Sequence, residues 1–161
     1  IHPAGLNEGE KQFIYDLKEY FGQIHERIKD KEIYVLRNLP KRGIGFFKKN
    51  YFYPDFIIWI VNDQKQSLLF VDPKGMSHMW EGLDEEKILL YKDLEDIQEG
   101  IRERKQVDIT LDSFIISINY YDEIKQIFNN KTRKTLEEHH ILFQKDDQTG
   151  YIEKMLKEYI E

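Results

Sequence analysis

The 161-residue chain contains no cysteine. This absence excludes disulfide bonds, thiolate zinc sites, iron–sulfur clusters and cysteine nucleophiles. The sequence also has no apolar run near the ~18 residues of a membrane-spanning helix, since its longest run, Phe56 to Val61, is only strand-sized. The first fifteen residues lack the apolar core of a secretory signal. We therefore expect a cytoplasmic protein with no membrane partner.

Several common functional motifs are missing as well. The sequence has no G-x-x-x-x-G-K-[ST] loop, so we expect that the chain does not itself use ATP, and it has no Gly-x-Ser-x-Gly motif. Adjacent His139 and His140 are predicted to point to opposite faces of a strand, which makes them a poor metal pair. His78 is interpreted as a surface residue rather than part of a site. Trp59 and Trp80 are expected to pack in the core and in a loop rather than to stack on bases.

The composition favours one domain of ordinary size. Hydrophobic residues make up 40% of the chain and aromatic residues 14%, which is enough to bury a real core. We expect residues 1–6 to be a linker and residues 7–161 to form a single domain that belongs to a longer polypeptide. The formal charge of −6 argues against tight autonomous binding to nucleic acid, although it leaves room for a local basic face.

Hydrophobic periodicity predicts an α/β protein with a central mixed β-sheet flanked by helices. Asn7 is the expected N-cap of the first helix, and a loop with Gly43 and Gly45 is expected between the first two strands. Helices are predicted at Asn7 to about Ile28, Leu83 to about Arg104, Tyr120 to Asn129 and Tyr151 to Tyr159, and strands at Glu32 to Leu39, Tyr51 to Val61, Ser67 to Asp72, Ser113 to Asn119 and His140 to Gln144.

Three charged residues stand beside apolar strand sequences, where charged side chains are rare without a partner. Asp55 lies between Pro54 and Phe56, Asp72 ends the run Leu-Leu-Phe-Val, and Lys74 follows two residues later. The midpoint between Asp55 and Asp72 falls in the polar turn at residues 62–66, so a hairpin places the two carboxylates beside each other. Side chains two apart on a strand share a face. We therefore expect two carboxylates and one ammonium group to converge at one edge of the sheet.

Adjacent carboxylates repel each other, and a hard divalent cation resolves that repulsion. Mg²⁺ prefers one or two carboxylates, with waters and phosphate oxygens as its other ligands. A nearby lysine can orient or deprotonate a water held by the metal, while the ion polarises a phosphoryl group. The alternative is a buried ion pair between Asp72 and Lys74, with Asp55 as a turn or cap residue.

Glu10 and Lys87 are further candidates, each with two interpretations. The spacing of Glu10 from Phe13 and Leu17 places its carboxylate on the apolar face of the first helix, toward the sheet. Glu10 is also three residues after Asn7, the position of a capping-box glutamate. Lys87 lies on the inward stripe of the second long helix, where its amine either reaches a phosphate near the site or extends to solvent.

The order of these motifs resembles the PD-(D/E)xK nuclease superfamily, through Tyr53-Pro54-Asp55, Asp72-Pro73-Lys74 and an acidic residue in the first helix. Further residues resemble the C-terminal nuclease domain of type III restriction enzyme Res subunits and related helicase–nucleases. The resemblance covers most of the chain, from about Glu10 to Ile152. The residues that carry it are Gly45-Phe46-Phe47, Asn50 to Ile57, Asp72-Pro73-Lys74-Gly75, Asp84 to Ile88, and Ile141-Leu142-Phe143 before Tyr151-Ile152.

The resemblance implies a restriction-endonuclease-like fold and Mg²⁺-dependent hydrolysis of DNA phosphodiester bonds, with Mn²⁺ as a possible substitute. It implies that Asp55, Asp72 and the backbone carbonyl of Pro73 hold the metal. Lys74 would then position and activate the attacking water, and Glu10 would support the metal or its water shell. The third motif residue is Asp72 where many relatives have Glu, so this ligand has a shorter arm.

The resemblance also implies partners. Double-stranded DNA would be the substrate, an ATP-driven motor region would precede this domain in the same polypeptide, and a modification methyltransferase subunit would be a possible further partner. We expect sequence-blind, salt-sensitive contacts to the DNA backbone from basic residues around the site. These are Lys41, Arg42, Lys48, Lys49 and Lys87.

Two other functions stay open. The same fold could serve as a catalytically inactive docking or DNA-positioning module whose acidic site is unused. A structure-selective nuclease such as a junction resolvase is the weaker alternative, because such enzymes usually present a basic surface and this chain carries a charge of −6.

Overall fold

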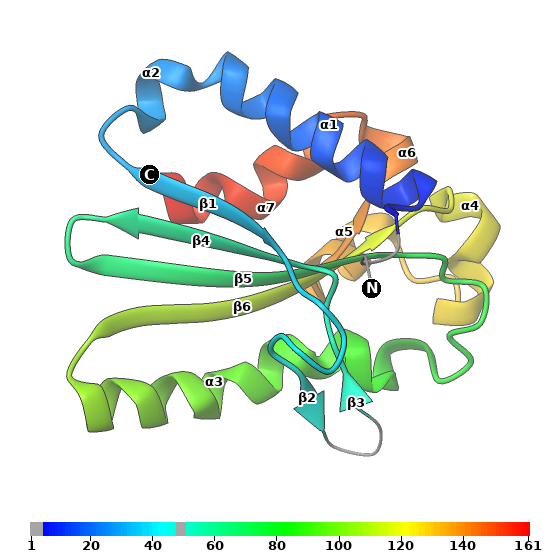
Figure 1. Cartoon of the computed structure of the whole chain (residues 1–161). Helices are drawn as coiled ribbons and strands as arrows, with labels where there is room; N and C mark the ends of the chain where they lie inside the picture. Colours follow the sequence, from blue (N-terminus) through cyan, green and yellow to red (C-terminus); the bar gives the residue numbers. More distant parts are fainter. Residues whose placement is uncertain (1–4, 48–50) are drawn as a thin grey trace.

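The computed structural model describes residues 5–47 and 51–161. These residues form a five-stranded mixed β-sheet with helices on both faces, which confirms the predicted α/β class (Figure 1). The strand order is β1-β4-β5-β6-β7, in which β1, β4 and β5 are antiparallel neighbours and β5, β6 and β7 run parallel. The strands are β1 (Glu32–Arg37), β4 (Phe56–Asn62), β5 (Lys65–Lys74), β6 (Asp108–Ser117) and β7 (Ile141–Phe143).

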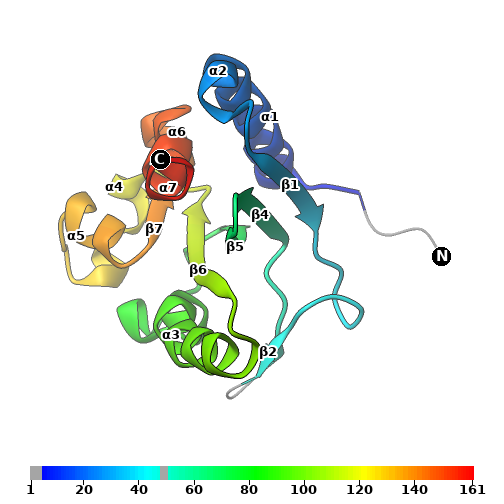
Figure 2. The same cartoon turned by 90° about the vertical axis from the view of Figure 1, so that its left-hand side faces the viewer.

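Helices cover both faces of the sheet and bury a core on each. Figure 1 shows α3 (Glu86–Lys105) along one face, where it makes the crossover from β5 to parallel β6, and α1 (Glu8–Gln23) with α7 (Gly150–Ile160) on the other. Figure 2 shows the same two layers from the side. Strand β4 contributes to both cores, Ile58 facing α1 and α7 and Ile57 facing α3, because successive strand residues point to opposite faces.

The predicted strand at Tyr51 to Val61 is wrong as a single element. Its first residues form β3 (Tyr51–Phe52), which pairs with β2 (Phe46–Phe47) in a separate two-stranded sheet, and the main strand β4 begins only at Phe56. Pro54, which has no backbone donor, lies in the break. The buried Asn38 amide holds this break in place, donating to the carbonyls of Pro54 and Ile44, each at 2.8 Å. Asp55 therefore follows a fixed bend instead of lying inside a continuous strand.

Strand β5 is longer than predicted and runs through Pro73 to Lys74. The pairing of β4 with β5 ends at Val71, whereas β6 continues beside β5 as far as Lys74. A proline is tolerated where a strand has lost its neighbour on one side. The extension carries Lys74 to the end of the sheet, next to β6.

The last third of the chain contains short helices that periodicity did not predict, because elements of four to six residues are too short to show it. They are α5 (Arg133–Glu138) and α6 (Gln144–Asp147). Two other short helices lie within predicted ones: α2 (His25–Ile28) continues the first, and α4 (Tyr121–Ile124) opens the third. Strand β6 begins at Asp108 rather than Ser113, because the buried Asp112 interrupts its apolar pattern. Within the described residues, no helix is long and apolar enough to cross a membrane.

His140 does not open the last strand as predicted, but precedes it with a left-handed φ of 64°. Its ring stacks between Tyr91 of α3, at 4.0 Å between centroids, and Phe114 of β6, at 4.8 Å. Its Nδ1 lies 2.8 Å from a carboxylate oxygen of Asp112. The other oxygen of Asp112 accepts a hydrogen bond from the Tyr159 hydroxyl of α7. This cluster joins both helical layers to the edge of β6.

The His140 cluster makes the stability of the fold depend on pH. Burial opposes protonation of the ring, but the hydrogen bond and charge of Asp112, with the Ser113 carbonyl and Glu158, outweigh it and raise the pKa of His140. A base with a raised folded-state pKa stabilises the protein fully below its unfolded pKa, near 6.5, and that stability is lost as the pH rises through the folded pKa. We therefore expect the Tm of the wild type to exceed that of His140→Gln most at about pH 5.5 and least at about pH 8.5.

Thermal denaturation of both proteins across that range measures the difference. His25→Gln is the matched control, since its side chain is 76% exposed. A gap between the wild type and His140→Gln that stays constant with pH would contradict the assignment.

Candidate metal centre

The register of the hairpin brings Asp55 and Asp72 together, as the sequence predicted. Phe56 pairs with Val71 and Asn62 with Lys65, so the turn at Asp63 and Gln64 is the predicted midpoint and Asp55 stands opposite Asp72. The backbone N–H of Asp55 donates to Oδ1 of Asp72 at 3.1 Å. The Asp72 side chain is buried, with 5% of the residue exposed, and Asp55 is half-buried.

The pKa values of both carboxyl groups in this pair are raised. Burial, the charge and hydrogen bond of Asp72 and the charge of Glu10 raise the pKa of Asp55 to about 8, against the opposing effect of Lys74. Burial also raises the pKa of Asp72, although its hydrogen bonds from Asp55 and the charges of Lys74 and Lys87 oppose this shift. The two carboxyl groups therefore resist carrying two negative charges at neutral pH without a cation between them.

Two lysines face Asp72 from different elements. Lys74 ends β5, and Lys87 lies in the first turn of α3 with its Nζ 5.1 Å from the centre of the Phe52 ring. Burial, with the hydrogen bond and charge of Lys74, lowers the pKa of Lys87, which the charge of Asp72 partly offsets. Lys87 is half-buried, with its amine over the Phe52 ring and its charge acting on Asp72, so both of its interpretations stay predictions.

Glu10 satisfies both of its interpretations in part. Its carboxylate accepts from the Asn7 backbone N–H at 2.9 Å, and the Asn7 side chain accepts from the Glu10 N–H at 2.9 Å, which completes a capping box at the start of α1. The charge of Glu10 also reaches Asp55 and raises its pKa. Gly9 lets α1 approach this closely, because a Cβ there would lie 2.6 Å from the Ile118 side chain, just past the end of β6.

The donor set at this point suits a hard cation with few protein ligands. Within residues 5–47 and 51–161, no three carboxylate or imidazole groups lie together as a complete cluster. Mg²⁺ needs only one or two carboxylates when waters and phosphate oxygens fill its other positions. Asp55 and Asp72 fit that requirement, and a cation between them would relieve the unfavourable charge that raises the pKa of Asp55.

The residues that shape the centre include asparagines that sequence reasoning missed. Asn38 fixes the bend before Asp55 through its contacts with the Pro54 carbonyl and the Ile44 backbone. Asn119, after β6, accepts from the Met76 N–H at 2.8 Å and so fixes the chain beyond Lys74. An asparagine in a loop is an ordinary turn signal, so only the tertiary contacts reveal this role.

The predicted DNA-contact residues are placed unevenly. Lys41 and Arg42 are exposed in the loop before β2, while Lys48 and Lys49 lie outside the described residues.

The prediction that Trp80 packs within a loop is wrong, because 79% of this residue is exposed. His78 is exposed as predicted, and Trp59 is half-buried, its indole donating to Gln66 at 3.1 Å.

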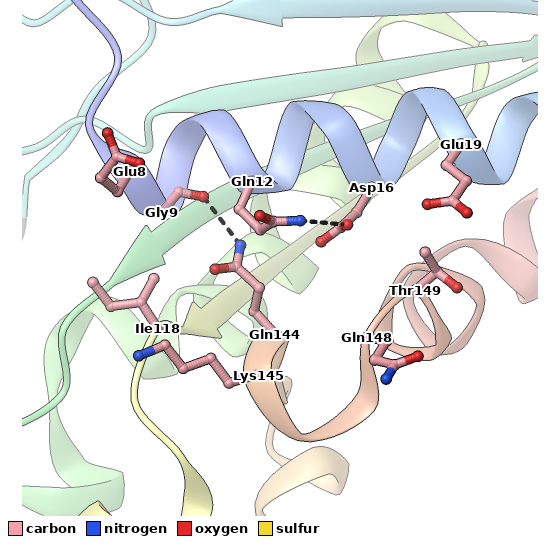
Figure 3. Close-up of a pocket in the computed structure, with 10 residues that line it drawn as sticks. All are labelled: Glu8, Gly9, Gln12, Asp16, Glu19, Ile118, Gln144, Lys145, Gln148 and Thr149. Carbon is pink, nitrogen blue, oxygen red and sulfur yellow. Dashed lines mark hydrogen bonds between the residues drawn. The ribbon is translucent and has the colours of Figure 1, made fainter.

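A second feature of this end of the fold is a polar groove of about 590 Å³ between α1 and the α6–α7 segment (Figure 3). Its buried groups are bonded to each other: Gln144 donates to the Gly9 carbonyl at 3.0 Å, and Asp16 accepts from Gln12 at 2.9 Å and from the Tyr151 hydroxyl at 2.6 Å. The bond from Gln144 ties α6 to α1, and the bond from Tyr151 ties α7 to α1. The candidate metal ligands are not among the described residues that line the groove.

The paired carboxyl groups generate a stability prediction for the metal-free protein. An acid with a raised folded-state pKa destabilises the fold as the pH rises from its unfolded value, near 4, toward its folded value. With a folded pKa of about 8, Asp55→Asn should therefore raise the Tm in EDTA progressively between about pH 4 and pH 8.5. Mg²⁺ or Mn²⁺ should raise the Tm of the wild type more than that of the variant.

Thermal denaturation with and without metal measures both effects, and Asp30→Asn, at an exposed aspartate, is the control. A variant no more stable than the wild type at high pH in EDTA would contradict the raised pKa of Asp55 in the fold.

The sequence matches no protein-family model, and no curated protein is significantly similar to it.

Proposed function

We propose that this chain is a Mg²⁺-dependent endodeoxyribonuclease domain of the PD-(D/E)xK superfamily, with a restriction-endonuclease-like fold. The observation that carries the proposal is the pairing of Asp55 with Asp72 where β4 and β5 adjoin, with Lys74 and Lys87 beside Asp72. A five-stranded mixed sheet flanked by helices is compatible with that fold. Acidic groups that need a cation, next to amines that attract phosphate, suit phosphodiester hydrolysis better than either group alone.

In this proposal Asp55, Asp72 and the Pro73 carbonyl hold Mg²⁺, and Mn²⁺ can replace it. When bound, such an ion would supply Lewis-acid chemistry, polarising the scissile phosphate and stabilising the departing oxygen. Lys74 holds the attacking water in line with the phosphorus and draws its proton away. Glu10 keeps its place in the capping box and adds negative charge that favours the cation.

Basic residues around the centre hold the DNA backbone without reading its sequence. In this proposal Lys87 binds a non-bridging phosphate oxygen, which its electrostatic interaction with Lys74 and Asp72 supports. Exposed Lys41 and Arg42 add contacts at the rim, to which the sequence adds Lys48 and Lys49. Such contacts weaken steeply with salt.

The wider context follows from the sequence resemblance. We propose that the domain is the cleavage module of a type III restriction Res subunit or a similar helicase–nuclease acting on double-stranded DNA. ATP would then act only through a motor region of the same polypeptide, and a methyltransferase subunit is a possible partner. A charge of −6 is compatible with a module whose partners supply most of the DNA contact.

Cleavage of supercoiled plasmid tests the proposal. At high protein concentration with Mg²⁺ or Mn²⁺, we expect nicking and linearisation by the wild type. Asp72→Ala should abolish cleavage, because it removes a metal ligand. Lys74→Ala should lower the cleavage rate roughly 100- to 10,000-fold, the usual contribution of a positioned acid–base group. Asp30→Ala and Lys134→Ala, both at exposed positions, should cut like the wild type.

The outcomes separate the alternatives. Cleavage that survives both site substitutions would refute the assignment of the centre. Absence of cleavage together with calorimetric Mn²⁺ binding that Asp72→Ala abolishes would mean that the site needs its motor region. Absence of both cleavage and Mn²⁺ binding would refute the proposal that the chain is a nuclease.

That last result would favour a catalytically inactive docking or DNA-positioning module of the same fold. One observation fits this second candidate: the Glu10 carboxylate is already engaged by the Asn7 backbone and would have to serve the cap and the centre together. The intact set of Asp55, Asp72 and Lys74 favours the enzyme, because an unused site gains nothing from buried carboxylates that repel each other.

A further inference from the structure

Two strongly exposed aromatic rings flank the candidate metal centre in the sequence. Trp80 is 79% exposed and Tyr51 is 70% exposed, and among the described large hydrophobic residues only Tyr15, at 66%, is comparable. Tyr51 lies four residues before Asp55, and Trp80 lies six residues after Lys74. An exposed large apolar side chain is informative when it adjoins a site, because burial would otherwise stabilise it.

Trp80 is exposed on a loop that is itself well anchored. The loop at residues 75–85 leaves the centre at Lys74 and returns to it at α3, which carries Lys87 (Figure 1). Met76 and Met79 of this loop are buried, with 0% and 3% exposed, and the Met79 N–H donates to the Met76 carbonyl at 3.1 Å. The exposure of Trp80 is therefore a fixed feature of the turn.

Each exposed ring has an aromatic neighbour that orients it. Trp80 meets the His78 ring at 6.2 Å between centroids and 66° between planes. Tyr51 stacks on Tyr53 at 6.1 Å and 19°. The Tyr53 ring in turn packs on the backbone of Gly45, where a Cβ would approach within 2.5 Å of the ring. Each of the two segments next to the centre in the sequence therefore carries an exposed ring in contact with a second ring.

Exposed aromatic rings stack poorly on a fully paired duplex, because its bases already stack on each other, but they stack well on unpaired bases. Stacking also suits a chain of charge −6, because it adds affinity without further phosphate contacts. We infer that the strand cut at this centre is held as unpaired nucleotides, with bases stacked on Trp80 and Tyr51, the exposed rings that flank the centre in the sequence. This inference rests on the proposed nuclease function and specifies its substrate as opened DNA.

Binding provides the first test, independent of cleavage. Trp59→Phe leaves Trp80 as the single tryptophan, because the chain has two. In EDTA, a single-stranded oligonucleotide of about 15 nucleotides should quench and shift the Trp80 fluorescence, and the matching duplex should do so at least about fivefold more weakly, the effect expected for one stacked base. Equal quenching by the two DNAs, or none by either, would overturn the inference.

Cleavage provides the second test. With Mg²⁺, we expect a labelled duplex with a central bubble, and the single strand, to be cut faster than the fully paired duplex of the same sequence. Trp80→Ala and Tyr51→Ala should each slow cutting of the bubble at least about fivefold and leave the duplex rate unchanged. Tyr15→Ala is the matched control, since Tyr15 is equally exposed on α1.

The two proposals fail in distinguishable ways. Equal cutting of all three DNAs, unaffected by Trp80→Ala, would overturn the inference and leave the nuclease in place. Cutting that is insensitive to Asp72→Ala would refute the proposed centre, whatever the substrate preference.

Discussion

The repulsion between Asp55 and Asp72 is the constraint on which the rest of the centre depends. Burial, together with the charge and hydrogen bond of the neighbouring Asp72, raises the pKa of Asp55 to about 8, so the pair disfavours the doubly charged state. A fold that only needed to be stable would replace one of them, because an uncompensated buried charge is costly. The charges of Lys74 and Lys87 offset the raised pKa values only in part. The surrounding residues hold the pair in place and bring amines to its side.

Several parts of the fold hold that arrangement. The hairpin register sets Asp55 opposite Asp72, Asn38 fixes the bend at Pro54, and the end of β6 supports the extension of β5 that carries Lys74. Helix α3 then supplies Lys87 from its first turn. Because these contacts come from well-packed elements, the centre is pre-organised by the scaffold and does not depend on a mobile loop.

Local charge, and not net charge, governs what this surface can bind. The chain is acidic overall, yet Lys74 and Lys87 converge on one point, where field strength depends on distance and burial. The same separation of global and local properties applies to the aromatic residues. Most of them build the two cores, while Trp80 and Tyr51 stay exposed beside the centre. The amino-acid composition gives the number of these residues but does not show which of them are buried.

The sequence by itself determined the features that depend on local spacing. The period of apolar residues predicted the long helices and the mixed sheet, Asn7 was correctly identified as a cap, and the distances of Asp55 and Asp72 from one polar turn predicted their pairing, because hairpin register follows from the turn. Only the tertiary structure decided where the predicted strand from Tyr51 breaks, that the Lys87 amine lies over the Phe52 ring and that Trp80 stays exposed. Each of these depends on residues distant in sequence, such as Asn38 for the break and Phe52 for Lys87, whose contacts arise only when the elements pack.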